Sequence, residues 1–515
     1  MVRKEARFLG IALLLVLLAA CAAPPTPVPP TPVPPTAAPP APTQAPAATS
    51  APAATQPPAP TATPPQPPPT TAPTQPPPTA APTKAAVATA VPPTPTNPIP
   101  ATPVPGKKVI TWWSHWANEP LKRQVIETIV ADYEATHPDV DIILTWWDAP
   151  PLQTAVKAAL TAGQGAPDIS TDVDLDNNVK AGWVLDLEST LPYDKFVDGV
   201  KIAGTFPHTK GVYNFEIGVQ ALMILYNREI FSKLGIQVPA NNQFTKDQFV
   251  DVVKKCNAAG YAGVADAVGN RNYPALFPIW AAMTQLVGRE KQADYDNGMT
   301  SWNTPEIRQV LNWLEQLRVA GMWPKSVATM TIDEFHVYFH TQQKACMLYV
   351  PSWYSGRAFK PVAEGGQSPE FKFGMMKYPL KDGAKFNNTL WAAFESGYMA
   401  LKTSKNPDIA KDILKFAAQP KYGALWTALT QIPSAIKYDP VKDWPKDLKG
   451  VDQWKWYWEE MDRVYAGMER AVGPGVSCGD FVDARTAAIN EGLPQGLITV
   501  DEAIKKVDAK LCVKK

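Results

Sequence analysis

The fold is decided by the stretch Gly211–Ile236, GVYNFEIGVQALMILYNREIFSKLGI. It holds two apolar segments, each short enough for a β-strand, with a break at Glu216–Gly218. An amphipathic helix begins after Asn227, and Gly235 ends it. The pattern predicts a strand, a kink, a second strand and a helix. Because the glycine at the break and the polar Gln220 interrupt the apolar run, we expect the backbone to turn here and to face a cavity.

The N-terminus has the features of a lipoprotein signal peptide over residues 1–20. A basic start, MVRKEAR, precedes the apolar run Phe8–Leu18, which is shorter than the ~20 residues of a membrane-spanning helix. The sequence LAAC that ends at Cys21 is typical of a lipobox, with cleavage before Cys21 and a lipid on the freed cysteine. An ordinary signal peptide with a chance cysteine and an uncleaved signal anchor are the alternatives.

Residues 22–105 form a low-complexity segment of Pro, Ala, Thr and Gln that contains 33 of the chain's 56 prolines. Such a segment cannot bury enough apolar surface to offset the entropy of ordering, and proline favours an extended polyproline II chain. We therefore predict that residues 21–106 consist of the lipidated Cys21 and a disordered stalk, which holds the folded part away from the membrane.

The folded part, residues 107–515, is too long for one simple core and predicts two lobes. The net charge of +1 gives no electrostatic basis for binding nucleic acid. Outside the cytoplasm the four remaining cysteines can form disulfides. We prefer the pair Cys478–Cys512, which would tie down the C-terminal helix, and interpret Cys256 and Cys346 as buried free thiols.

Strands and helices alternate at the start of the folded part. The segments are the β-rich Val109–Trp113, the helical Glu119–His137, the strand Val140–Trp146, the helical Pro151–Ala162 and the strand edge Asp168–Asp172. This order predicts an α/β lobe with a parallel sheet. Ligands of such sheets bind beyond the carboxyl ends of the strands. The residues expected there are Ser114, His115, Trp116, Trp147, Asp148, Asp172 and Asp174.

Several motifs resemble those of the extracellular solute-binding proteins of ABC importers, family 1, the carbohydrate-type branch that is maltose-binding-protein-like. ITWWSHW, residues 110–116, is similar to the family's opening strand, and ALTAGQGAPDIST, residues 159–171, is similar to its G-x-x-PD segment. HTQQKACMLYVPSWYSG, residues 340–356, is similar to its A-M-x-x-x-G-x-W segment. The run Tyr213–Asn227 is similar to the segment that crosses between lobes, but Glu216 stands where many relatives have proline.

The resemblance extends from Val109 to Leu511. It implies a two-lobed periplasmic-binding-protein-like fold of the α/β class, with a cleft between the lobes and three crossings, near Ile217, Pro379 and Pro433. The implied lobes are lobe I, residues 107–217 and 379–432, and lobe II, residues 218–378 and 433–515.

Carried over motif by motif, the resemblance also implies a ligand site. Trp353 matches the tryptophan that stacks on sugar in relatives, and Gln220 matches a polar position where the maltose-binding branch has a carboxylate. Either Asp172 or Asp174 matches the acidic residue after the family's PD strand. The other implied contacts are Tyr273, Phe277, Tyr354, Phe394, Glu395 and Phe481.

The tryptophan content also fits a sugar ligand. Sugars present C–H faces that stack on indole, and their hydroxyls bind carboxylates and amides. The chain has 17 tryptophans, several near predicted strand ends or in loops. Core packing is the alternative role, and we expect about half of these tryptophans to fill the core.

Metal and enzyme motifs are weak. His336 and His340 share a helical face, but no HExxH glutamate or third ligand accompanies them. The run from Asp172 to Asp176 lacks the glycine and glutamate of a calcium loop. No GxSxG, Walker or GxGxxG motif occurs in a suitable context. We therefore expect no metal or other cofactor and no enzymatic activity.

The sequence thus predicts a lipid-anchored monomer on the extracytoplasmic face of a bacterial membrane. It would capture an oligosaccharide or related polyol between its lobes and deliver it to the membrane subunits of an ABC importer. A lipid-anchored carbohydrate-active hydrolase with paired carboxylates is one alternative. A binding protein of this fold for a polyamine, a glycerol phosphodiester or a peptide is another, although no arginine cluster suited to phosphate is evident. An adhesive surface protein would show internal repeats, and none is apparent.

Overall fold

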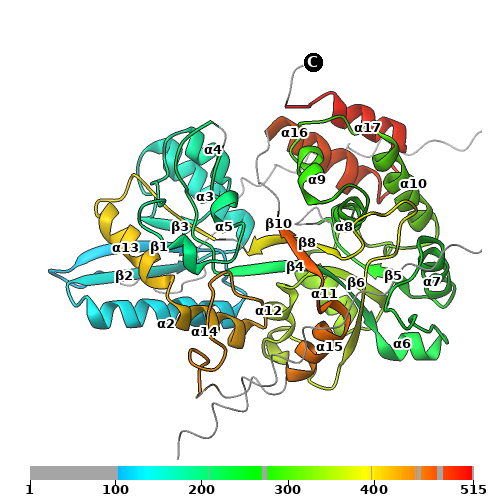
Figure 1. Cartoon of the computed structure of the whole chain (residues 1–515), viewed down its shortest axis with the longest axis horizontal. Helices are drawn as coiled ribbons and strands as arrows, with labels where there is room; N and C mark the ends of the chain where they lie inside the picture. Colours follow the sequence, from blue (N-terminus) through cyan, green and yellow to red (C-terminus); the bar gives the residue numbers. More distant parts are fainter. Residues whose placement is uncertain are drawn as a thin grey trace, which may run out of the picture. The chain divides into compact units, whose positions relative to one another are not determined.

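The computed structural model describes residues 102–512 except 207, 270–274, 396, 447, 449–453 and 473–478. The chain divides into the units Met1–Val87 and Ala88–Lys515, and all described residues belong to the second. Their strands form two sheets with helices on both faces (Figure 1), so the α/β class is confirmed. We call the parts built on these sheets lobe I and lobe II. Within the described residues, no helix has the length and apolar character needed to cross a bilayer.

Lobe I is built on the sheet β2-β1-β3-β9, in which only β9 is antiparallel to its neighbour. Alternate side chains of a strand enter different cores. Tyr398 and Ala400 of β9 pack with α2, α13 and α14, whereas Met399 packs with α3 and α4. The strands are β1 (Lys108–Ser114), β2 (Val140–Trp146), β3 (Ile169–Thr171) and β9 (Tyr398–Ala400). The helices are α2 (Pro120–Thr136), α3 (Ala149–Ala162), α4 (Leu175–Lys180), η1 (Tyr193–Lys195), α5 (Val200–Ala203), α13 (Pro407–Ala417) and α14 (Pro420–Thr430).

Helix α2 follows the predicted pattern. Pro120 occupies its first turn, where a backbone N–H has no partner within the helix. Val125, Ile126 and Ile129 recur at helical spacing and are fully buried, and burying each such side chain stabilises the fold by roughly 1.5–3 kcal/mol. Lys122 lies on the same stripe, three residues before Val125, and is also buried. Lys122 therefore occupies a core-facing position of α2, on a stripe whose other residues are apolar.

Lobe II is built on the sheet β10-β8-β4-β6-β5, with β7 paired to β4. Leu222 and Ile224 of β4 face α7, α8 and α10, whereas Met223 and Leu225 face α11 and α15. The strands are β4 (Gly218–Asn227), β5 (Ala262–Ala265), β6 (Ala345–Pro351), β7 (Phe373–Met376), β8 (Thr389–Glu395) and β10 (Glu469–Val472). The helices are α6 (Arg228–Lys233), α7 (Lys246–Ala258), α8 (Leu276–Val287), α9 (Arg289–Asp296), α10 (Pro305–Val319), α11 (Ile332–His340), α12 (Tyr354–Ala358), η2 (Val362–Glu364), α15 (Lys455–Tyr465), α16 (Gly479–Arg485), η4 (Thr486–Gly492) and α17 (Val500–Asp508).

Three segments that pass between the sheets lie side by side. Phe215, before β4, forms a bridge with Tyr398 at the start of β9. On the other side of β4, the N–H of Val219 donates to the carbonyl of Pro433 at 2.8 Å. The approach is close at Gly397, where a Cβ would lie only 2.1 Å from the Phe215 carbonyl oxygen. Backbone pairing thus fixes how the chain crosses between the lobes.

One predicted crossing is misplaced. The sequence predicted a return to lobe I near Pro379, but β8 still belongs to lobe II because Gly218–Ala221 pairs with Ala392–Glu395. The chain enters the sheet of lobe I only at β9. The predicted start of the second lobe I segment, at residue 379, is therefore wrong. The pairing of β8 with β4 joins strands that are distant in sequence, so no local pattern indicates it.

The cysteines of lobe II also differ from the prediction. Cys256 of α7 and Cys346 of β6, which are 90 residues apart, form a disulfide. Both are buried as expected, but the interpretation as free thiols is wrong. Cys478 lies outside the described residues, so the pair Cys478–Cys512 stays a prediction. Cys21 and its lipid lie outside them as well.

Two carboxyl groups meet at the crossing. Asp172 directly follows β3, Glu216 precedes β4, and their side chains are hydrogen-bonded to each other. Burial raises the pKa of Asp172 to about 6. Burial, followed by the charge of Asp172, raises the pKa of Glu216 well above its usual value. Because two carboxylates in contact cannot both ionise without cost, the pair holds a proton.

We expect removal of the Cys256–Cys346 disulfide to lower the free energy of unfolding by about 2–4 kcal/mol, because the crosslink restricts the unfolded chain. Urea unfolding of the C256A/C346A variant, compared with the unchanged chain, measures this. Reductant should destabilise the unchanged chain and leave the variant unaffected. Equal stability of the two proteins under oxidising conditions would contradict the expectation.

We expect the carboxyl pair to destabilise the fold as the pH rises. The folded chain binds more protons than the unfolded chain between the ordinary pKa of 3.8 and about 6, so the free energy of unfolding falls as pH rises through this range. For Asp172, the rise in pKa from 3.8 to about 6 corresponds to a decrease of about 3 kcal/mol in the free energy of unfolding, at 1.36 kcal/mol per pKa unit. E216Q replaces one acid by an amide that cannot ionise, so its stability relative to the unchanged chain should increase with pH.

Urea unfolding of both proteins from pH 4 to pH 7 tests the effect of the carboxyl pair. The matched control is E290Q, because Glu290 is exposed in the first turn of α9. E290Q removes a carboxyl group outside the pair, so a gain with pH equal to that of E216Q would show that the effect does not come from the pair. A constant difference for E216Q would show that the pair is not the titrating element.

Candidate functional site

A cavity of about 150 Å³ lies between the lobes. Lobe I contributes residues that follow β1 or begin α2, and lobe II contributes residues from β4, β6, β8, α8, α11 and α12. The lining residues are His115, Glu119 and Lys122 from lobe I, and Gln220, Phe277, Trp280, Ile332, Pro351, Trp353, Arg357, Trp391 and Glu395 from lobe II. Segments distant in sequence therefore meet at one site.

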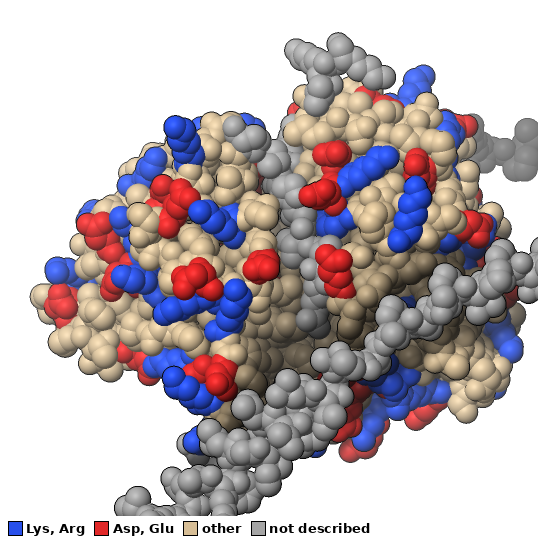
Figure 2. Space-filling view, in the orientation of Figure 1, with Lys and Arg blue, Asp and Glu red and all other residues tan. Residues whose placement is uncertain are grey.

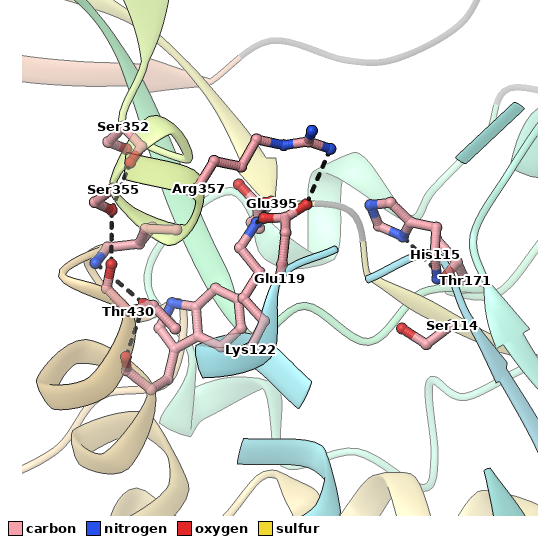
Figure 3. Close-up of polar contacts among 12 residues, drawn as sticks. Ser114, His115, Glu119, Lys122, Thr171, Ser352, Ser355, Arg357, Glu395 and Thr430 are labelled. Carbon is pink, nitrogen blue, oxygen red and sulfur yellow. Dashed lines mark hydrogen bonds and ion pairs between the residues drawn. The ribbon is translucent and has the colours of Figure 1, made fainter. Parts of the chain in front are cut away.

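A chain of ion pairs runs through this site from lobe I to lobe II (Figure 3). The Nζ of Lys122 lies 2.5 Å from Glu119 Oε2 and 2.6 Å from Glu395 Oε1. The guanidinium of Arg357 lies 3.4 Å from Glu119 Oε1 and 2.6 Å from Asp333 Oδ1. Except for Asp333, all these side chains are buried. Pairing is what makes their burial tolerable, since an isolated buried charge is costly.

Local structure positions these charges. Glu119 immediately precedes α2, and Lys122 lies in its first turn on the buried stripe. Glu395 is the last residue of β8, at the point where the chain leaves lobe II. Arg357 lies in the short helix α12, four residues after Trp353, so both approach the cavity from the same side of that helix.

The charges fix the ionisation of Glu119. Burial alone would raise its pKa, but the positive charges of Lys122 and Arg357 lower it to about 2. Glu119 is therefore a carboxylate at any physiological pH. It can accept hydrogen bonds, but it cannot donate a proton as a general acid does.

Aromatic rings form much of the rest of the cavity wall. The indoles of Trp280 and Trp391 are stacked in parallel with their centroids 4.6 Å apart. Trp353 is partly buried and packs against the hydrophobic clusters of both lobes. The Nε1 of Trp391 and the Oε1 of Gln220 are buried and have no hydrogen-bond partner among the described residues. The cavity wall thus combines apolar indole faces with two polar atoms that have no hydrogen-bond partner among the described residues.

A second polar contact joins the lobes near the cavity. The Oγ of Ser355 in α12 donates to the carbonyl of Thr430 at the end of α14 at 2.6 Å (Figure 3). On the lobe I side, His115 Nδ1 lies 3.2 Å from the Oγ1 of Thr171, which ends β3. These contacts help to position helix α12 and the ends of β1 and β3 beside the ion pairs.

The structure separates the predicted site residues into groups. Those that line the cavity are His115, Gln220, Phe277, Trp353 and Glu395. Those that are fully buried in the cores and do not line it are Ser114, Trp116, Tyr354 and Phe481. Ser114 Oγ, for example, lies 2.9 Å from the hydroxyl of Tyr398 within lobe I. Tyr273 lies outside the described residues.

The remaining predicted residues lie at other places. Asp172 belongs to the carboxyl pair at the crossing, and Asp174 is exposed on a groove between α3 and α4. Asp148 is exposed and accepts a hydrogen bond from Asn118 at 2.7 Å. Phe394 packs against the core of lobe I, and its carbonyl accepts from Gln220. Neither Asp172 nor Asp174 lines the cavity.

Sequence reasoning missed the central charges of the site. The missed lining residues are Glu119, Lys122, Trp280, Ile332, Pro351 and Arg357. One signal was present, because Lys122 lies at the helical spacing of Val125 and Ile126 and therefore on a core-facing stripe. A lysine at such a position needs a buried carboxylate, and Glu119 is three residues before it. The sequence contains no comparable signal for Glu395, whose contact with Lys122 spans 273 residues.

The two histidines considered as metal ligands have other contacts. His340 Nδ1 lies 2.9 Å from the Tyr354 hydroxyl, and its Nε2 lies 3.2 Å from the carbonyl of Gly365. The ring of His336 lies 5.5 Å from that of Trp353, beside the cavity. Among the residues that the structure describes, no group of three or more His, Cys, Asp or Glu side chains could hold a metal ion.

The surface carries charges of both signs. On the face shown in Figure 2, basic and acidic side chains are interspersed over both lobes. Several of them form exposed pairs, such as Lys108 with Asp139 at 3.0 Å. The described part of this face therefore has no continuous basic area of the kind that binds nucleic acid.

Comparisons with known proteins agree with this architecture. The chain matches a protein from a study of xylan utilization by the thermophilic bacterium Caldanaerobius polysaccharolyticus, with a TM-score of 0.65, 21% identity and coverage of 78% of this chain and 100% of that chain. A chitin oligosaccharide binding protein matches with a TM-score of 0.64, 19% identity and coverage of 78% and 98%. RafE from Streptococcus pneumoniae, solved in complex with raffinose, matches with a TM-score of 0.58, 19% identity and coverage of 79% and 100%.

The family assignment rests on the sequence. No curated protein sequence matches the chain. The family model described as bacterial extracellular solute-binding protein matches residues 117–424, which include the ion pairs and the crossings before β4 and before β9, but not the one at Pro433. Because this match covers more than half of the chain, the protein belongs to the family of bacterial extracellular solute-binding proteins.

Proposed function

We propose that this protein binds a sugar between its lobes and delivers it to the membrane subunits of an ABC importer. The observation that carries the proposal is the interlobe cavity, in which Trp280, Trp353 and Trp391 accompany buried carboxylates and Gln220. Indole faces suit the C–H faces of a sugar ring, and carboxylate and amide oxygens suit its hydroxyls. The chitin oligosaccharide binding protein and raffinose-bound RafE, which have a similar fold, support a sugar ligand.

The cellular setting is part of the same proposal. The LAAC sequence at Cys21 supports a lipid anchor, and the proline-rich residues 22–105 support a stalk that holds the two lobes away from an extracytoplasmic membrane face. Family membership supports an importer as partner. We propose that the protein acts as a monomer, because the two lobes of one chain form the site.

Binding is proposed to work by a shift of population. His115, Glu119 and Lys122 belong to lobe I, whereas the tryptophans belong to lobe II. A solute in the cavity contacts both groups only when the lobes are closed, so it stabilises the closed state. Closure of the lobes also forms the surface to which the importer subunits bind.

A carbohydrate-active hydrolase is the alternative, and the charges disfavour it. A glycosidase needs one protonated carboxylic acid and a second carboxylate. Glu119, with a pKa of about 2, stays ionised, and Glu395 is paired with Lys122. We therefore propose that the carboxylates of the cavity bind the solute and perform no chemistry on it.

We expect sugars to raise the melting temperature of the purified chain in a concentration-dependent manner, because a ligand that binds the native state stabilises it. A thermal-shift panel of mono- and oligosaccharides, polyamines, glycerol phosphodiesters and peptides identifies the class. W353A should weaken binding of the best sugar about tenfold or more, since an aromatic contact of about 1.4 kcal/mol corresponds to that factor.

The matched control for the tryptophan is W444A, because Trp444 is 38% exposed and does not line the cavity. It should bind the sugar as the unchanged chain does. Stabilisation by polyamines or peptides alone would show that the solute belongs to one of those classes and is not a sugar. Equal binding by W353A and W444A would show that the sugar does not use the cavity.

We also expect the bound sugar to be recovered unchanged. Overnight incubation followed by chromatography of the sugar measures this, with a glycosidase of matching specificity as positive control. Products that accumulate with the unchanged chain but not with E119Q or E395Q would support the hydrolase instead.

A further inference from the structure

Arg357 lines two cavities between the lobes. One is the cavity of about 150 Å³ described above. The other has a volume of about 280 Å³. Its lining residues are Asn118 from lobe I and Asp333, His336, Val337, Arg357, Lys360, Glu364 and Gly365 from lobe II. We call the first the inner cavity and the second the outer cavity. Because Arg357 is in both walls, its guanidinium stands between them.

The two partners of Arg357 lie on opposite sides of this boundary. Glu119, which accepts from Nη2, lines the inner cavity, whereas Asp333, which accepts from Nη1, lines the outer one. Figure 3 shows the guanidinium extended from α12 towards lobe I. The side chain is 90% buried. Moving it requires breaking a buried ion pair, which leaves a buried charge without its partner.

The inner cavity is small. At about 30 Å³ per water, its 150 Å³ corresponds to roughly five water molecules, and pockets for drug-sized ligands begin at about 300 Å³. The inner cavity therefore leaves no room for more than about one sugar ring, and a longer solute would have to extend beyond it. Arg357 is the lining residue that the two cavities share, so a solute that extended from the inner cavity into the outer one would have to pass its side chain.

The charges of the inner cavity are internally paired. Lys122 has Glu119 and Glu395 as partners, and Arg357 has Glu119 and Asp333. A charged solute would have to replace one of these pairs, whereas a neutral polyol needs only hydrogen bonds. Burial of an unpaired charge is costly, so the pairing favours a neutral solute.

We propose that Arg357 is the residue that sets solute length and restricts this protein to a neutral sugar of one ring. This inference rests on the proposed sugar-binding function and narrows it from oligosaccharides to monosaccharides. Arg357 acts as a barrier between the inner and outer cavities. Replacing it by alanine joins the two spaces and lets a second ring enter.

Titration calorimetry with the purified full-length chain tests this. The probes are glucose, maltose and maltotriose, then xylose, xylobiose and xylotriose, then N-acetylglucosamine and its dimer and trimer, with glucuronate and glucosamine as charged one-ring compounds. For the series that binds, the unchanged chain should prefer the monosaccharide to the trimer by about tenfold or more, and R357A should lose or reverse that preference, a change of about 1.4 kcal/mol or more.

The variant is expected to fold. Without Arg357, Glu119 keeps Lys122 as its partner, and Asp333 is 48% exposed. Thermal unfolding checks this, and R357K, which keeps the charge without the fork that reaches two carboxylates, is a second variant with the same expected direction. The matched control is R463A, because Arg463 pairs with Glu460 away from both cavities. It should keep the monosaccharide preference.

The outcomes separate this inference from the function on which it rests. Tighter binding of dimer or trimer than of the monosaccharide by the unchanged chain would overturn the length limit while leaving sugar binding intact. So would an unchanged preference in R357A and R357K. Preference for glucuronate or glucosamine over neutral sugars would overturn the inferred neutrality. If none of the probes bound, the proposed function would fail and this inference with it.

Discussion

A buried lysine between two carboxylates holds the lobes in register. The ammonium of Lys122 is withdrawn from water on the apolar stripe of α2, and the cost of burying such an ion is several kcal/mol unless it is paired. Glu119 supplies one partner from the same lobe and Glu395 supplies the other from the end of β8. The indoles of Trp116 and Trp426 lie 5.4 and 6.0 Å from the ammonium and add cation–π attraction. Helix α2 therefore keeps its buried position only while the end of β8 stays beside it.

The position of Glu395 beside Lys122 places a further acidic side chain near Asp172 and Glu216 at the crossing. Glu395 approaches Lys122 from the segment that also brings β9 to lobe I, and Asp172 and Glu216 lie next to that segment. Glu395 contributes to raising the pKa of both acids. The ammonium of Lys122 already pairs with Glu119 and Glu395. Asp172 and Glu216 therefore reduce the repulsion between their carboxyl groups by keeping a proton. Burial is thus the main cause of the proton on the carboxyl pair, and the charge of the ion-paired Glu395 adds to it.

Local patterns in the sequence predicted the elements but not their partners. The bounds of α2 and the position of β1 follow from spacing and from proline, which act within a few residues. The place of β8 in lobe II, the Cys256–Cys346 disulfide and the contact of Glu395 with Lys122 each join segments 90 or more residues apart. No periodicity records such pairings. The predicted site shows the same limit, since the end of β1 was identified, but only pairing and packing decide that His115 lines the cavity while Ser114 and Trp116 enter the core.

The internal pairing of the charges also suits a protein that binds and releases a solute. A site whose ions are already satisfied does not depend on the solute to neutralise them, so the side chains are held in place before binding and little ordering remains to oppose it. The solute then replaces water on indole faces and at a few polar atoms, and it leaves without exposing an unpaired charge. Catalysis requires a different arrangement, in which a carboxyl group changes its protonation during the reaction. Glu119, fixed as an anion by Lys122 and Arg357, is suited to the first role and unsuited to the second.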